Sequence, residues 1–124
     1  MIARKKKILV VDDDQLLSDA LKQILDDEGY RVFVINDGRL LNDYLQKNKP
    51  DLILLDYCLP GRDGLTLAGN LKKNMNTAEI PVIMISASVD FNGKKKLENV
   101  DAFLAKPFLI GDLLLMIENY LPAV

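Results

Sequence analysis

Short apolar runs recur along this chain, and four of them end directly on a reactive polar side chain. The runs are ILVV before Asp12 and Asp13, LILL before Asp56, VIMI before Ser86 and AFLA before Lys106. Apolar runs that alternate with stretches of helical period are typical of strand–helix units around a parallel sheet. Because ligands of such sheets bind beyond the carboxyl ends of the strands, these polar side chains should meet at one site.

The strands themselves are predicted at about 7–11, 31–35, 52–55, 82–85 and 102–105, and most are apolar at every position. Such strands need cover on both faces, so helices must pack on both sides of the sheet. The sequence therefore predicts an α/β fold class, a doubly wound five-stranded parallel sheet of order 2-1-3-4-5.

Five helices are expected to follow the strands, with apolar residues at helical spacing facing the core. The first, at about 15–27, should end at Gly29 in a left-handed conformation, and the third should cover about 65–73. A short fourth helix within 89–100 has few apolar residues. The core-facing stripes expected for the first, second and fifth helices are Leu16, Leu17, Ala20, Leu21, Ile24 and Leu25; Leu40, Leu41, Tyr44 and Leu45; and Ile110, Leu113, Leu114, Ile117 and Leu121.

Composition narrows the functional classes. The 124 residues fit one domain, 1–124, and 49% hydrophobic with 27% charged residues is typical of a globular protein. A net charge of -2 argues against direct nucleic-acid binding, and no run approaches the roughly 20 apolar residues that span a membrane. Cys58 is the single cysteine and is expected to be half-buried; without an intrachain disulfide, a cytoplasmic location is the simplest expectation.

Three aspartates at one site repel each other, by roughly 1 to 4 kcal/mol per pair at about 4 Å. A divalent cation that prefers oxygen ligands, Mg²⁺ or the similar Mn²⁺, would offset this repulsion. The alternative is that one of the aspartates stays protonated, which leaves Ser86 and Lys106 without a role. The chain contains no His that could act as a base near neutral pH.

With a cation present, a carboxylate can attack a phosphoryl donor in line. Asp56 is the best candidate because it ends the central third strand, opposite Asp12 and Asp13. Lys106 and the Ser86 hydroxyl can each contact a phosphoryl oxygen. Asp14, in contrast, is expected only to cap the first helix.

The motifs VVDDD, LLDYCLPGRDG, MISA and FLAKPF together resemble the receiver domain of response regulators, over essentially the whole chain. The resemblance implies a flavodoxin-like (βα)5 fold and a switch in a two-component phosphorelay, phosphorylated on Asp56. It also implies an Mg²⁺ site made by Asp12, Asp13, Asp56 and the backbone carbonyl of Cys58. Ser86 and Lys106 would contact the phosphoryl group, and Lys106 would precede a cis peptide bond at Pro107.

The same resemblance implies that Ser86 moves inward on phosphorylation and that an aromatic residue, here Phe103, turns into the vacated space. Ser86 replaces the commoner Thr and keeps the hydroxyl, whereas Phe103 replaces the frequent Tyr and lacks one. The implied partners are a sensor histidine kinase or phosphotransfer protein and an unidentified downstream protein. The chain would not be an enzyme beyond promoting its own phosphorylation and slow dephosphorylation.

Two alternatives stay open. A receiver-like interaction module that is never phosphorylated would have no need to keep Asp12, Asp13, Ser86 and Lys106 together. A small phosphatase of the haloacid dehalogenase kind could use Asp12 and Asp14 as an Asp-x-Asp pair, but that fold normally requires a longer chain.

Overall fold

The computed structural model describes residues 4–87 and 99–122, which form a five-stranded parallel sheet with helices on both faces. The strands are β1 (Lys7–Val11), β2 (Arg31–Ile35), β3 (Leu52–Asp56), β6 (Val82–Ser86) and β7 (Ala102–Ala105). They are ordered β2-β1-β3-β6-β7, which is the predicted order 2-1-3-4-5. Three strands begin and end as predicted, and β3 and β6 each extend one residue further to include Asp56 and Ser86.

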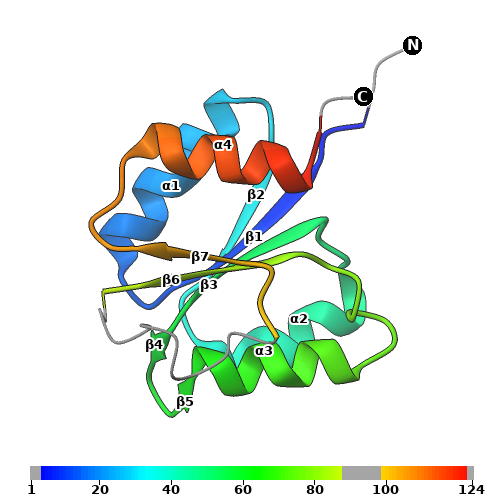
Figure 1. The fold of residues 1–124 in the computed structure, drawn as a ribbon. Coiled ribbons are helices and arrows are strands. Elements are labelled where there is room, and N and C mark those ends of the chain that lie inside the picture. Colours follow the sequence, from blue (N-terminus) through cyan, green and yellow to red (C-terminus); the bar gives the residue numbers. More distant parts are fainter. Residues whose placement is uncertain (1–3, 88–98, 123–124) are drawn as a thin grey trace.

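Two separate cores explain why the strands are apolar at nearly every position. In β1, Leu9 and Val11 pack in the cluster on one face of the sheet, whereas Ile8 and Val10 pack in the cluster on the other. Figure 1 shows α2 and α3 covering one face and α1 and α4 covering the other. Successive side chains of a strand point to opposite faces, so both sets are buried, as the prediction of two-sided cover required.

The described helices are α1 (Gln15–Asp27), a 3₁₀ turn (Gly38–Leu40) leading into α2 (Leu41–Lys47), α3 (Gly64–Lys73) and α4 (Ile110–Tyr120). These match the first, second, third and fifth predicted helices. Gly29 has φ of 98°, so the expected left-handed residue after α1 is present. The fourth predicted helix, within 89–100, lies almost wholly outside the described residues.

Four residues that were assigned to core stripes are instead exposed: Leu16, Ala20, Leu40 and Ile110. The clearest case is Leu16, whose relative exposure is 83%. Residues of a helix are about 100° apart, so Leu16 lies about 140° around the helix from the buried Leu21. The predicted stripe of α1 was too wide, and its buried face is centred on Ser18, Leu21 and Leu25.

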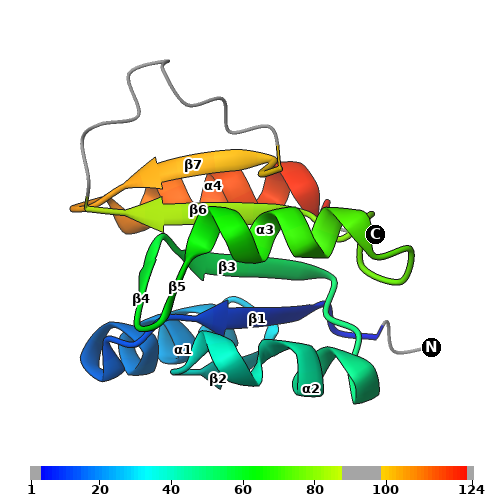
Figure 2. The ribbon, with the colours of Figure 1, turned by 90° about the horizontal axis from the view of Figure 1, so that it is seen from below.

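A small antiparallel hairpin that was not predicted follows the central strand. It consists of β4 (Cys58–Leu59) and β5 (Arg62–Asp63), with Gly61 at φ of 78° in the turn. Figure 2 shows this hairpin beyond the end of β3, at the edge toward which the strand arrows point. Cys58 lies in the hairpin and is exposed, so the expectation that it is half-buried was wrong.

Among the described residues, no helix has both the length and the apolar character needed to cross a membrane.

Candidate functional site

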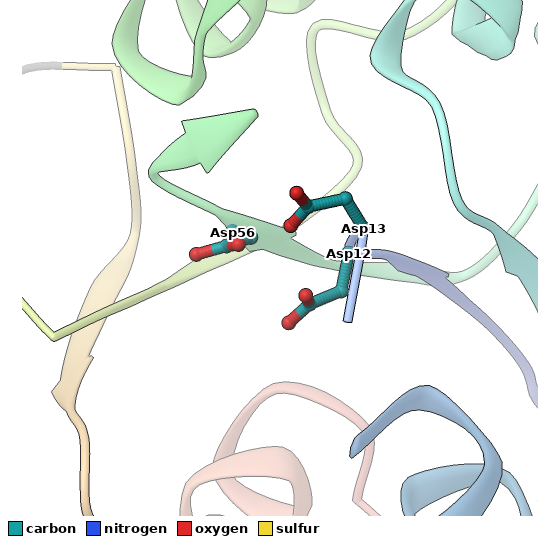
Figure 3. Close-up of side chains that lie close together, drawn as sticks. All are labelled: Asp12, Asp13 and Asp56. Atoms are coloured by element: carbon teal, nitrogen blue, oxygen red, sulfur yellow. The ribbon is translucent and has the colours of Figure 1, made fainter. Parts of the chain in front are cut away.

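The carboxyl ends of the central strand β3 and its neighbour β1 bring three aspartates together, as the sequence predicted. Asp12 and Asp13 directly follow β1, and Asp56 is the last residue of the neighbouring β3. One carboxylate oxygen from each of the three lies within 4.8 Å of the others. Figure 3 shows the three carboxylates grouped at these strand ends.

Lys106 reaches this group from the edge of the sheet, directly after β7. Its Nζ lies 3.4 Å from Asp12 Oδ2 and 3.6 Å from Asp56 Oδ1, so one ammonium group is shared by two carboxylates. Asp12 and Asp56 are buried, whereas Asp13 is exposed. Two of the three carboxylates are therefore buried beside the Lys106 ammonium, whereas the third reaches solvent.

Burial is the main cause of an unusual property of Asp56. The pKa of this carboxyl group is raised to about 6, chiefly by removal from water and also by the nearby Asp12 and Asp13 carboxylates. The Lys106 ammonium and the backbone N–H of Cys58 act in the opposite direction and compensate only in part. The site thus carries more negative charge than its own groups neutralise.

The donor set suits a divalent cation of the Mg²⁺ type. Oxygens that share one octahedral Mg²⁺ are about 3 to 4 Å apart, since each bond is about 2.1 Å long. The three carboxylates are close to this spacing, so small side-chain rotations would let them share one ion. The described residues near them offer no sulfur or imidazole ligand to this cluster, which argues against a Zn²⁺ site.

The unpredicted hairpin has a clear role beside Asp56. The backbone N–H of Cys58, two residues after Asp56, favours the ionised form of that carboxyl group and so lowers its pKa. The hairpin returns so closely that Gly64 donates its N–H to the Tyr57 carbonyl at 2.7 Å. A Cβ atom at Gly64 would lie 2.6 Å from the Asp56 carbonyl oxygen, so only glycine fits there without a shift.

Ser86 and Phe103 lie where the sequence placed them, on the adjacent strands β6 and β7. Ser86 is buried at the end of β6, and its carbonyl accepts the Lys106 N–H at 2.8 Å. Phe103 is partly buried in β7, opposite Met84, and packs against the core beneath α2 and α3 rather than among the carboxylates. The peptide bond between Lys106 and Pro107 is cis, as the resemblance implied.

Asp14 caps α1, as predicted, by accepting the Leu17 N–H at 3.1 Å. It lies outside the group of three clustered carboxylates. Its own N–H donates to Asp12 Oδ1 at 2.9 Å, so the loop that begins α1 also restrains the Asp12 side chain. The Asp-x-Asp pair on which the phosphatase alternative relied is therefore divided between a clustered carboxylate and a helix cap.

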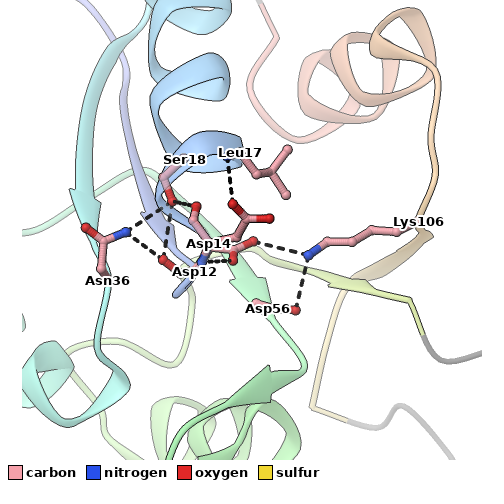
Figure 4. A network of polar contacts seen from close by, with 7 residues as sticks. All are labelled: Asp12, Asp14, Leu17, Ser18, Asn36, Asp56 and Lys106. Carbon is pink, nitrogen blue, oxygen red and sulfur yellow. Dashed lines mark hydrogen bonds and ion pairs between the residues drawn. The ribbon is translucent and has the colours of Figure 1, made fainter.

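Two polar residues near the site were not predicted, Asn36 and Ser18. Asn36 Nδ2 donates to the Asp12 carbonyl at 2.7 Å and contacts Ser18 Oγ at 3.2 Å. Figure 4 shows both side chains next to Asp12, with Lys106 drawn on its other side. A signal for Asn36 existed, because it follows the apolar strand β2 just as Asp12 follows β1, whereas Ser18 is an ordinary helix residue in the sequence.

Known proteins resemble this chain over most of its length. The family model for the response regulator receiver domain matches residues 8–118. The protein YbdJ of Bacillus subtilis, described as an uncharacterized transcriptional regulatory protein, is 39% identical over 116 residues. That match covers 93% of this chain and 50% of YbdJ, so the chain spans about half the length of this curated relative.

Solved structures give the same result. The receiver domain of a signal transduction histidine kinase from Syntrophus aciditrophicus is 31% identical with a TM-score of 0.87, covering 94% of this chain and 89% of that one. The response regulator TrrA from Thermotoga maritima, solved in complex with Mg²⁺ and BeF, is 27% identical with a TM-score of 0.84. That alignment covers 93% of this chain and 98% of TrrA. The chain therefore belongs to the response regulator receiver domain family.

Proposed function

We propose that this receiver domain is a switch in which Asp56 accepts a phosphoryl group with the help of Mg²⁺. Receiver domains act in two-component signalling with histidine kinases and phosphotransfer proteins, and a phosphorylation-activated role follows from that membership. The observation that carries the finer proposal is the meeting of Asp12, Asp13 and Asp56 with a lysine that reaches two of them.

In the proposed step, a carboxylate oxygen of Asp56 attacks the phosphorus of the donor in line with the leaving group. A new oxygen–phosphorus bond forms while the bond to the donor's nitrogen or oxygen breaks, and the leaving atom keeps the electron pair. Asp56 must be ionised to attack. With a pKa of about 6 in the absence of a cation, it is mostly ionised at neutral pH.

Asp12, Asp13, Asp56 and the Cys58 backbone carbonyl would hold the cation, which is Mg²⁺ or Mn²⁺. When bound, it would neutralise charge on the phosphoryl oxygens and offset the repulsion among the carboxylates. Support comes from the carboxylate spacing, from the raised pKa of Asp56, and from the Mg²⁺ that TrrA binds in its solved complex.

Lys106 and Ser86 would each contact one oxygen of the phosphoryl group after transfer. Lys106 is already held beside Asp56 by their mutual attraction, so little reorganisation is needed at the moment of transfer. An inward movement of Ser86 would open space into which Phe103 turns. Phe103 is partly buried on β7, which pairs with β6, the strand that ends at Ser86. Its side chain would therefore turn within the same side of the sheet.

The altered surface would then bind an unidentified downstream protein, and the signal would end when water hydrolyses the aspartyl phosphate. On this proposal the protein converts no separate substrate, since its chemistry is confined to gaining and slowly losing its own phosphoryl group. Neither nucleic acid nor a membrane would be contacted by this domain directly.

Incubation with Mg²⁺ and acetyl phosphate, followed by mass spectrometry of the protein and its peptides, tests the proposal. The expected result is a single phosphoryl group on Asp56. When EDTA is added before the donor, no phosphoryl group should be transferred. Asp51→Asn is a matched control, because Asp51 directly precedes the same strand, at the end opposite Asp56, and accepts the Lys7 N–H. Asp56→Asn should abolish labelling, and Asp51→Asn should not.

Labelling of Asp56→Asn to the level of the parent, or labelling that is insensitive to EDTA, would show that Asp56 is not the acceptor. Absence of labelling from any donor in a protein that binds Mg²⁺ would instead favour the interaction module that is never phosphorylated.

A further inference from the structure

We infer that Asn36, supported by Ser18, positions the acidic pair Asp12 and Asp13 for cation binding, an inference that rests on the proposed function. The Asn36 amide nitrogen and the Ser18 hydroxyl bond to backbone carbonyls and to each other, so both are engaged with the framework around the carboxylates. Asn36 acts on the backbone that carries this pair, and Ser18 holds Asn36 in place (Figure 4). They are therefore positioning residues.

The need for such residues arises where the sheet ends. The N–H of Asp12 donates to the Ile35 carbonyl at 3.1 Å, which continues the bonding between β1 and β2 past the last paired residues, Val11 and Ile35. Asn36, the next residue after Ile35, turns its side-chain amide to the Asp12 carbonyl at 2.7 Å. A side chain thus supplies a donor one step beyond the last bond between the strands.

The Asp12 carbonyl is a sensitive point for the whole acidic pair. The peptide unit from Cα of Asp12 to Cα of Asp13 is planar, so the direction of this carbonyl fixes the plane that joins the two residues. Rotation of that plane would redirect both side chains at once. A hydrogen bond at this single oxygen therefore controls the relative placement of two of the proposed cation ligands.

Ser18 acts mainly by holding Asn36 in place. Its Oγ lies 2.8 Å from the Asp14 carbonyl and 3.3 Å from the Asp12 carbonyl, and a hydroxyl group has one proton to donate. We assign that proton to the shorter contact with Asp14. Ser18 Oγ is then free to accept the second amide hydrogen of Asn36 at 3.2 Å, so the Asp12 carbonyl depends chiefly on Asn36.

Burial makes the arrangement hard to replace. Ser18 has no exposed surface and Asp12 is 2% exposed, so water has little access to take over the bond to the Asp12 carbonyl. A buried carbonyl without a hydrogen-bond donor is costly in free energy, so the backbone would shift to find another donor. Partners that orient metal ligands commonly change metal affinity by about 10-fold to 100-fold when they are removed.

The test is the dissociation constant of Mg²⁺ for the intact chain, measured by calorimetry for the parent, Asn36→Ala and Ser18→Ala. Asn36→Ala should raise the dissociation constant about tenfold, and Ser18→Ala about threefold. Thr77→Ala is the matched control. It also removes a buried hydrogen bond from a side chain to a backbone carbonyl, that of Leu71 at 2.7 Å, but far from the site.

Unfolding by urea in EDTA separates positioning from general destabilisation. Asn36→Ala and Thr77→Ala should lower the free energy of unfolding by similar amounts, but only Asn36→Ala should lower the affinity for Mg²⁺. If the Mg²⁺ dissociation constant of Asn36→Ala lies within twofold of the parent's, the inference is overturned and the proposed function is not. The same holds if Thr77→Ala loses as much Mg²⁺ affinity as Asn36→Ala. A parent protein that binds no Mg²⁺ would overturn the proposed function and this inference with it.

Discussion

Lys106 Nζ lies 3.6 Å from Asp56 Oδ1, although the two residues come from different strands and β6 lies between those strands in the sheet. The contact is an ion pair between a buried carboxylate and a lysine side chain that is 22% exposed. Lys106 also contacts Asp12, so it offsets the charge of two groups that repel each other. Its effect on chemistry should therefore exceed its effect on folding.

Lys106→Met keeps most of the side-chain volume and removes the charge. We expect phosphorylation of Asp56 by acetyl phosphate at saturating Mg²⁺ to slow by about 100-fold, because a preorganised charge next to the transferred group is lost. The rate is measured by quenching timed samples and determining the phosphorylated fraction by mass spectrometry.

Lys72→Met provides the control for that measurement. The Lys72 side chain is also 22% exposed and pairs with Asp101 at 3.0 Å, but it belongs to α3 and binds the Ala78 and Ile80 carbonyls. This variant should be less stable than the parent and yet be phosphorylated at the same rate. A rate for Lys106→Met within a factor of three of the parent would contradict the assigned role.

The raised pKa of Asp56 predicts a dependence of stability on pH that is opposite to the usual one for an aspartate. The folded protein holds this proton up to a pKa of about 6, whereas the ordinary pKa in the unfolded chain is 3.8. Between these values the folded state binds more protons, so the free energy of unfolding falls as pH rises through this window. The shift corresponds to about 3 kcal/mol at most.

Asp56→Asn removes this contribution. In EDTA at pH 7 the variant should be more stable than the parent by about 1 to 3 kcal/mol, and the difference should disappear near pH 4. Urea unfolding at pH values from 4 to 8 measures it. Added Mg²⁺ should reduce or reverse the difference, since only the parent keeps all three carboxylates. A variant less stable than the parent at pH 7 without divalent cations would contradict the electrostatic account.

Ser86 offers a test of the hydroxyl rather than of the residue. Ser86→Ala should slow phosphorylation by about tenfold, the effect of losing one hydrogen bond to the transferred group, whereas Ser86→Thr should keep the parent's rate. Both variants need their Mg²⁺ dissociation constants measured, and these should be unchanged. Equal rates for the alanine and threonine variants would mean that the hydroxyl has no part in the transfer.

The sheet and the carboxylate cluster could be predicted because strand ends are marked by abrupt changes from apolar to polar residues, as at Val11 and Asp12. The face that a helix buries was harder to predict. Leucine is common on both sides of a helix, and Leu16 differs from Leu21 only in its angle around the axis. The hairpin at Cys58 was missed because two-residue strands are too short to show any period. The role of Asn36 depends on register, which fixes its side chain opposite the Asp12 carbonyl.

Gly64 is the point at which the hairpin meets the central strand, and it gives a prediction about stability. An added Cβ would lie 2.6 Å from the Asp56 carbonyl oxygen and 2.9 Å from Tyr57 Cα. Both are backbone atoms, which can move aside only at a cost in free energy. Gly64→Ala should therefore lower the free energy of unfolding by about 1 to 3 kcal/mol. It should also weaken Mg²⁺ binding, because the displaced backbone carries Asp56.

Gly111→Ala is the matched control. Nothing lies within 4 Å of its added Cβ in α4, so alanine there should be neutral or stabilising by up to about 1 kcal/mol. Urea unfolding and calorimetric Mg²⁺ titration of both variants make the comparison, and equal stability of the two would refute the close-contact explanation.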